Sequence, residues 1–215
     1  MRSLAGRLGE EGRPAASAML KPLIAGVRSE PSTAVRRAYA AAAAALAVRC
    51  SSERRRERLV QDALASYGAA QLSLPAWVPG GACGQAVAST AGATPDEAPS
   101  ADTASRLAGG LLLRELLRES SDAFALHAGV VLPVAFIASL DEEAAVASAW
   151  GNVWGQGAAS EPAALRLYAP ELAGLVAGGL ASSSWPRKRA AAKARVVALC
   201  VPRMHNSLNV CAPHA

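Results

Sequence analysis

The segment "PSTAVRRAYAAA", residues 31–42, gives the clearest indication of the fold. An alanine-rich run without proline or glycine follows it. Ser32 and Thr33 are residue types that cap helix N-termini, and apolar residues at spacings of three and four predict one buried helix face. Arg36 and Arg37 lie off this face, which we expect to carry Val35, Tyr39, Ala42 and Leu46.

Similar helical patterns recur along the chain. The segment "ERLVQDALASYG", residues 57–68, predicts a helix that ends at Gly68. Later stretches show the same spacing of large apolar residues, with short turns between them. The predicted buried residues are Leu59, Ala63 and Tyr67; Leu107, Leu111 and Leu117; Val146, Trp150, Val153 and Trp154; and Leu165, Tyr168, Leu172, Leu175 and Val176.

Prolines and capping residues predict where these helices begin and bend. Pro133 lies inside an apolar segment and predicts a kink, while Pro170 predicts a bend within a helix spanning residues 161–180. Asp122 and Asp141 are candidate N-caps. About seven helices in pairs, with a repeat of roughly 40 residues, are typical of HEAT-type repeats.

Composition favours the same fold class. Of 215 residues, 52% are hydrophobic but only 4% are aromatic, and alanine and leucine favour packed helices over strands. We therefore predict an all-α, HEAT/armadillo-like α-solenoid of antiparallel helix pairs, with an ordinary helical bundle as the alternative. The predicted divisions are helices in 1–68, a flexible Pro/Gly/Ser-rich loop at 69–101, further repeats in 102–199 and an irregular tail at 200–215.

Charge and cysteine usage bound the possible partners. The net charge is +5, and all charged residues after Glu171 are cations. The four cysteines form no CxxC pair, which favours reduced thiols in an intracellular protein. The apolar stretches are too short and too alanine-rich to predict a membrane span, and the first residues lack the apolar region of a signal peptide.

No local signature of catalysis or cofactor binding is present, so we expect a non-enzymatic protein without cofactors or small-molecule substrates. His127 lies in an apolar segment and is expected to be packed or partly exposed. A four-ligand metal site can be written from the C-terminal residues, but their spacing lacks the close pairs typical of zinc sites. Those residues are Cys200, His205, Cys211 and His214.

Two basic segments are candidate binding surfaces. In "ERRRER", residues 53–58, glutamates partly neutralise the cations, which favours a solvated helix surface over an anion-binding patch. In "WPRKRAAAKAR", residues 185–195, no carboxylate is present. We expect the tryptophan to pack in a turn and the cations to point outward towards a protein. The candidate protein-binding residues are Trp185, Arg187, Lys188, Arg189 and Lys193.

Four blocks in order resemble the proteasome adapter and scaffold protein family: "VLPVAFIASLDEE", "SAWGNVW", "LRLYAPEL" and "GLASSSWPRKRAAAKA". The resemblance covers roughly residues 20–68 and 105–195. It implies a HEAT-repeat scaffold of the cytoplasm and nucleus that links the regulatory and core particles of the 26S proteasome. The alternatives are a HEAT-type adaptor in another pathway and a basic helical module that binds nucleic acid; the missing aromatic interleaving makes the nucleic-acid reading the weaker one.

Overall fold

The computed structural model describes residues 18–50, 52–68 and 101–208, and these residues form helices joined by turns, with no strand among them. The predicted all-α fold is therefore confirmed. The predicted loop at 69–101 lies outside the described residues except for its last residue, which begins α6. The helices are α3 (Leu20–Ser29), α4 (Thr33–Cys50), α5 (Glu53–Ser66), α6 (Ala101–Glu119), α7 (Ser121–Ala125), α8 (Ala128–Ala138), α9 (Ala144–Gly157), α10 (Glu161–Leu167), α11 (Ala169–Ala181) and α12 (Trp185–Leu208).

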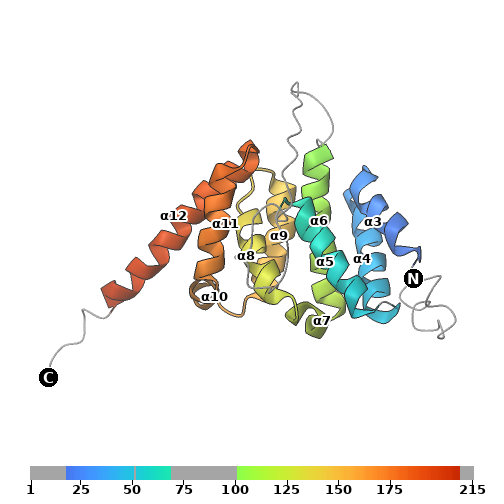
Figure 1. Ribbon diagram of the computed structural model, residues 1–215, viewed down its shortest axis with the longest axis horizontal. Helices are drawn as coiled ribbons and strands as arrows, with labels where there is room; N and C mark the ends of the chain where they lie inside the picture. Colours follow the sequence, from blue (N-terminus) through green and yellow to red (C-terminus); the bar gives the residue numbers. More distant parts are fainter. Residues whose placement is uncertain (1–17, 51, 69–100, 209–215) are drawn as a thin grey trace, which may run out of the picture.

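The described helices stand side by side in a row, with α3 and α4 at one end and α12 at the other (Figure 1). Helix α4 packs on α3 and α6, α9 packs on α6 and α8, and α11 packs on α8 and α12. Helix α5 covers α6, and the short helix α10 contacts both α11 and α12. Each helix thus packs mainly on its neighbours in the row.

One apolar cluster runs through the described helices. The predicted stripe of α5 is confirmed, because Leu59, Ala63 and Tyr67 are all buried. The predicted stripe of α9 is confirmed as well, and Trp150 is fully buried at its centre. Helix α6 comes close to α5 at Gly109, where an added Cβ would lie 2.4 Å from the carbonyl oxygen of Ala63.

The predicted buried face of α4 is only partly correct: Tyr39 and Leu46 are half-buried against the core, and Ala42 is half-buried as well. Val35 is 41% exposed, whereas the fully buried positions are Ala40, Ala43 and Ala47. Arg36, which was expected to lie off the buried face, is only 4% exposed, and its Nε donates to the carbonyl of Glu30. The physical reason is that an alanine-rich helix is apolar on every side, so a neighbouring helix can pack on any of its faces.

Two prolines have different roles from each other. Pro133 lies inside α8, as expected, and is buried with its neighbours. Pro170 does not bend a longer helix: the predicted helix at 161–180 is two helices, and Pro170 stands in the first turn of the second, α11. Pro is favoured at such a position because the first-turn N–H groups have no intrahelical partner. Splits of this kind raise the predicted number of about seven helices to the ten described above.

The predicted helix starts also need correction. Ser120, not Asp122, caps α7, because its side chain accepts a hydrogen bond from the backbone N–H of Ala123. The predicted irregular tail from residue 200 is not what the structure has, since α12 continues to Leu208. Pro202 removes one backbone donor without ending the helix. Residues 209–215 lie outside the described part of the chain.

Candidate interaction surface at helix α12

Helix α12 begins directly after a serine-rich turn. The backbone N–H of Ser184 donates to the Ser182 side chain (3.1 Å), and the N–H of Lys188 donates to the Ser184 carbonyl (3.1 Å). Pro186 stands in the first turn, where its missing N–H costs nothing. The helix then packs through three alanines that are 0% exposed, Ala190, Ala191 and Ala194. Small side chains allow α12 to lie close to α11, where an added Cβ at Gly179 would stand 2.7 Å from the Cβ of Ala191.

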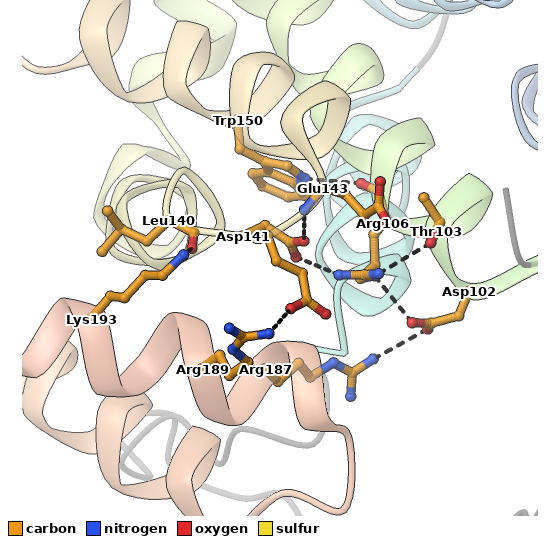
Figure 2. Close-up of polar contacts among 11 residues, drawn as sticks. Asp102, Thr103, Arg106, Leu140, Asp141, Glu143, Trp150, Arg187, Arg189 and Lys193 are labelled. Atoms are coloured by element: carbon orange, nitrogen blue, oxygen red, sulfur yellow. Dashed lines mark hydrogen bonds and ion pairs between the residues drawn. The ribbon is translucent and has the colours of Figure 1, made fainter. Parts of the chain in front are cut away.

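Three cations of α12 reach other parts of the molecule, although Arg189 and Lys193 stay exposed to solvent (Figure 2). Arg189 pairs with Glu142 at 2.7 Å, and the Lys193 ammonium donates to the carbonyl of Leu140 at 3.2 Å. Arg187 lies 4.0 Å from the Asp102 carboxylate. The prediction that these cations point outward is wrong for Arg187, whose side chain is largely covered. Arg189 and Lys193 are exposed but also contact the α8–α9 turn.

The same region contains a buried ion pair that the sequence analysis did not single out. Arg106 of α6 is 2% exposed, and its Nη1 donates to the Asp141 carboxylate at 2.5 Å (Figure 2). Arg106 also pairs with Asp102 at 3.1 Å and donates to the Thr103 hydroxyl at 3.2 Å. Asp141 was expected to cap the next helix, but the N-cap of α9 is Glu143. Asp141 accepts the N–H of Glu143 at 3.0 Å and neutralises Arg106.

Aromatic side chains close one side of this ion pair. The Trp150 indole N–H donates to the carbonyl of Arg106 at 2.9 Å. The Tyr67 ring packs at a tilt against Trp150, with 5.5 Å between the ring centres. Burial of the Tyr67 ring, together with the negative charge of Asp141, raises the pKa of its phenol well above the usual value. The phenol is therefore neutral across the physiological range.

Gly68 joins this cluster to α12. Its φ of +79° lies in the left-handed region, which favours glycine. The Arg187 guanidinium occupies the space next to it, because an added Cβ would lie 2.0 Å from the guanidinium carbon. Gly68, Asp102, Arg106, Asp141 and Arg187 thus hold α5, α6, the α8–α9 turn and α12 together. Their role in the structure is to fix the position of α12.

The opposite side of α12 carries an exposed apolar stripe. Trp185 is 65% exposed and Val196 is 63% exposed, so the prediction that Trp185 packs in the turn is wrong. Ala192 lies between them at helical spacing and is exposed as well. Lys188 is half-buried and Arg195 is exposed, and both flank this stripe. We call these five residues the outer stripe of α12.

The structure therefore divides the five predicted binding residues into two groups. Trp185 and Lys188 lie on the outer stripe, where a partner can reach them. The other three, Arg187, Arg189 and Lys193, make contacts within the molecule, although Arg189 and Lys193 are also exposed. Arg195 is accessible as well. It follows Lys188 by two helical turns, and this spacing in the sequence predicts that the two side chains lie on the same side of the helix.

The remaining candidate residues give no sign of a catalytic or metal centre in the part of the chain that the structure describes. His127 is half-buried at the start of α8, as expected. Within the described residues, no group of three or more His, Cys, Asp or Glu side chains is arranged to hold a metal ion. Of the four C-terminal Cys and His residues, Cys211 and His214 lie outside the described part. None of the described helices is long and apolar enough to cross a membrane.

Comparisons with known proteins add no relative. No protein-family model matches the chain, and neither the curated proteins nor the solved structures searched include a match. The resemblance to the proteasome adapter and scaffold protein family therefore stays a prediction from the sequence.

Proposed function

We propose that this chain is a non-enzymatic helical scaffold of HEAT type, which binds a protein partner through the outer stripe of α12. The partner that the sequence resemblance suggests is the 26S proteasome, at its regulatory and core particles. This places the protein in the cytoplasm and nucleus. The observation that carries the proposal is the exposed stripe of Trp185, Ala192 and Val196, bordered by Lys188 and Arg195.

The arrangement of the helices supports the scaffold part of the proposal. Repeat proteins of this type stack helices so that each contacts only its neighbours. In the described part of the chain, α3 and α4 have no extensive contacts with α11 or α12. An elongated row of this kind offers long exposed ridges to partners rather than one enclosed pocket.

The chemistry of the outer stripe indicates what it binds. A large exposed apolar side chain such as Trp185 loses unfavourable contact with water when a partner covers it, and tryptophan is enriched among the residues that dominate binding energy. Cations at the edge of such a surface favour a partner with acidic residues around an apolar centre. The buried alanine face of α12 and the contacts of Arg187, Arg189 and Lys193 hold the helix in place, so the outer stripe is a preformed surface.

An affinity capture experiment tests the proposal. The tagged chain is captured from cell lysate with ATP present, and the bound proteins are identified by mass spectrometry. The test variant is Trp185→Ser with Arg195→Glu. The matched control is Leu126→Ser with Arg54→Glu, which also removes one exposed apolar side chain and reverses one exposed charge but lies off α12.

We expect regulatory- and core-particle subunits with the parent chain and with the control, and their loss with the test variant. If another protein complex shows this pattern, the scaffold proposal stands and the proteasome is withdrawn as the partner. If nuclease treatment removes all captured material, the chain is a nucleic-acid-binding module and the scaffold proposal fails.

A further inference from the structure

A second surface lies between α3 and α5, towards the end of the row opposite α12 (Figure 1). These two helices form a groove of about 550 Å³, which is within the size range of ligand-binding clefts. Its floor is apolar and is formed by Leu20 and Ile24 of α3 and by Leu59 of α5. A second hollow of about 230 Å³ shares Lys21, Ile24 and Asp62 with the first, so the groove continues along α3.

The walls of this groove are strongly basic. Lys21, Arg55 and Arg58 line the larger hollow, and Arg28 lines the smaller one. All four side chains are exposed, and none of them has an ion pair within the described part of the chain. Among the described residues that line the groove, Asp62 is the one carboxylate. The excess of positive charge around an apolar floor is therefore complementary to an anionic ligand that carries apolar groups.

We propose that the α3–α5 groove binds an acidic amphipathic helix of a partner protein. The apolar side of such a helix would cover mainly Ile24, which is half-buried, and the accessible edges of Leu20 and Leu59, which are 8% and 3% exposed. Its flanking carboxylates would pair with the cations of the walls. This assigns a binding role to Arg55 and Arg58 in the "ERRRER" segment, which the sequence analysis favoured as a solvated surface.

Two other anionic partners fit the groove less well. Single-stranded nucleic acid is bound by stacking its bases on aromatic side chains, and none of the described residues that line the groove is aromatic. A membrane surface is bound by an apolar face that projects into the lipid, whereas this apolar floor is recessed between charged walls. The Asp62 carboxylate would also repel the closely spaced phosphates of a nucleic acid or a membrane. It can, however, accept a hydrogen bond from a lysine or amide of a protein partner.

This inference does not depend on the outer stripe of α12, since the two surfaces share no residue. If both sites bind, the chain would hold two partners at the two ends of one row of helices. Either site can also fail alone, because the variants that test them lie on different helices.

The test uses the full chain and a fluorescent helical peptide as the probe. The probe carries leucines at helical spacings of three and four with glutamates beside them, and a control peptide has the same leucines with lysines beside them. Binding is followed by fluorescence anisotropy. We expect saturable binding of the acidic peptide only, and an affinity that falls as the salt concentration rises.

Matched variants then locate the site. Arg55→Glu with Arg58→Glu should weaken binding by about tenfold or more, because two favourable charge contacts become repulsive. Arg54→Glu changes the same kind of charge on the same helix but does not line the groove, so binding should be unchanged. Both proteins should give the same circular dichroism spectrum as the parent chain, since the altered side chains are exposed.

Several outcomes would overturn the inference. One is the absence of saturable binding of the acidic peptide, and another is equal weakening by the Arg54 variant. A third is tighter binding of single-stranded DNA or of anionic phospholipid vesicles that is lost with Arg55→Glu and Arg58→Glu, which would assign the groove to nucleic acid or to membranes.

Discussion

Arg106 and Asp141 form a buried ion pair that joins α6 to the turn between α8 and α9, with 2.5 Å between Nη1 and Oδ2. Their side chains are only 2% and 0% exposed, so water cannot replace either partner if the other is removed. Trp150 lies next to the pair (Figure 2), and its indole N–H donates a hydrogen bond to the backbone carbonyl of Arg106. The pair is therefore the buried centre of a polar cluster that also includes Asp102 and Thr103.

Removal of one member of this pair should destabilise the protein strongly. We expect Arg106→Met to lower the free energy of unfolding by about 3–5 kcal/mol, because the Asp141 carboxylate stays buried without its main partner. Urea denaturation followed by circular dichroism measures the loss. Glu142→Ala is the control: its pair with Arg189 is partly exposed and should contribute at most about 1 kcal/mol.

The double variant Arg106→Met with Asp141→Asn separates the pair from simple loss of packing. Asparagine can still accept the N–H of Glu143, and no unpaired charge is left. We expect it to be more stable than the sum of the two single variants predicts, since the residues interact directly. Additive effects would show that Arg106 and Asp141 act independently of one another.

Gly109 tests how closely α5 and α6 pack. An added Cβ would lie 2.4 Å from the Ala63 carbonyl oxygen and 2.3 Å from the Ser66 hydroxyl. Backbone cannot move away as a flexible side chain can, so Gly109→Ala should cost about 1–3 kcal/mol of stability, as overpacked sites do.

The matched control is Gly174→Ala, inside α11. Nothing lies within 4 Å of a Cβ added there. Because alanine favours the helix over glycine, this variant should be more stable by about 0.5–1 kcal/mol. The same substitution should thus have opposite signs in thermal unfolding at the two sites. A stable Gly109→Ala protein would contradict the close contact between α5 and α6.

A comparison of α5 and α9 with α4 shows how much of the fold could be predicted from the sequence. The stripes of α5 and α9 were predicted correctly because large apolar residues, such as Leu59 and Trp150, recur among polar ones and leave one possible buried face. In α4, alanines surround the whole helix, and periodicity cannot select a face. The buried side instead follows from where α3 and α6 lie, which depends on contacts distant in sequence.

The candidate site was predicted in part for the same reason. The basic start of α12 is evident in the sequence, but the direction of each cation depends on Glu142, Asp102 and the Leu140 carbonyl, which come from other elements. The Arg106–Asp141 pair joins residues 35 positions apart. Only the Asp102–Arg106 spacing of four hinted that Arg106 belongs to a polar cluster.

The raised pKa of Tyr67 predicts how stability changes at high pH. In the unfolded chain the phenol ionises near the ordinary tyrosine pKa of 10.0, while in the folded chain it stays protonated to higher pH. The unfolded state therefore loses a proton first, and the stabilisation from Tyr67 is complete below pH 10 and lost as the pH rises through the folded pKa. Above pH 10, the parent chain should lose about 1.4 kcal/mol per pH unit relative to Tyr67→Phe.

Denaturant unfolding of both proteins at several pH values measures this difference. The phenylalanine variant keeps the ring contact with Trp150 but has no proton to release. The two proteins should show a constant stability difference from neutral pH to about pH 9. Their stabilities should diverge once the pH reaches the range in which the tyrosine of the unfolded chain ionises, near pH 10. A constant difference through pH 11 would mean that the Tyr67 phenol is accessible to water in the folded state.

Fluorescence quenching tests the orientation of α12. Trp185 is 65% exposed, whereas Trp150 is 0% exposed and Trp154 is 6% exposed. Iodide, which is excluded from protein interiors, should therefore reach Trp185 but neither Trp150 nor Trp154. The fourth tryptophan, Trp77, lies outside the described residues, so all proteins in this test carry Trp77→Phe. Trp185→Phe should lower the fraction of the emission that iodide can quench, and Trp154→Phe, which removes a buried emitter, should raise it. If Trp185→Phe leaves the quenched fraction unchanged, the ring is covered in solution, and the outer stripe of α12 would not be available to a partner.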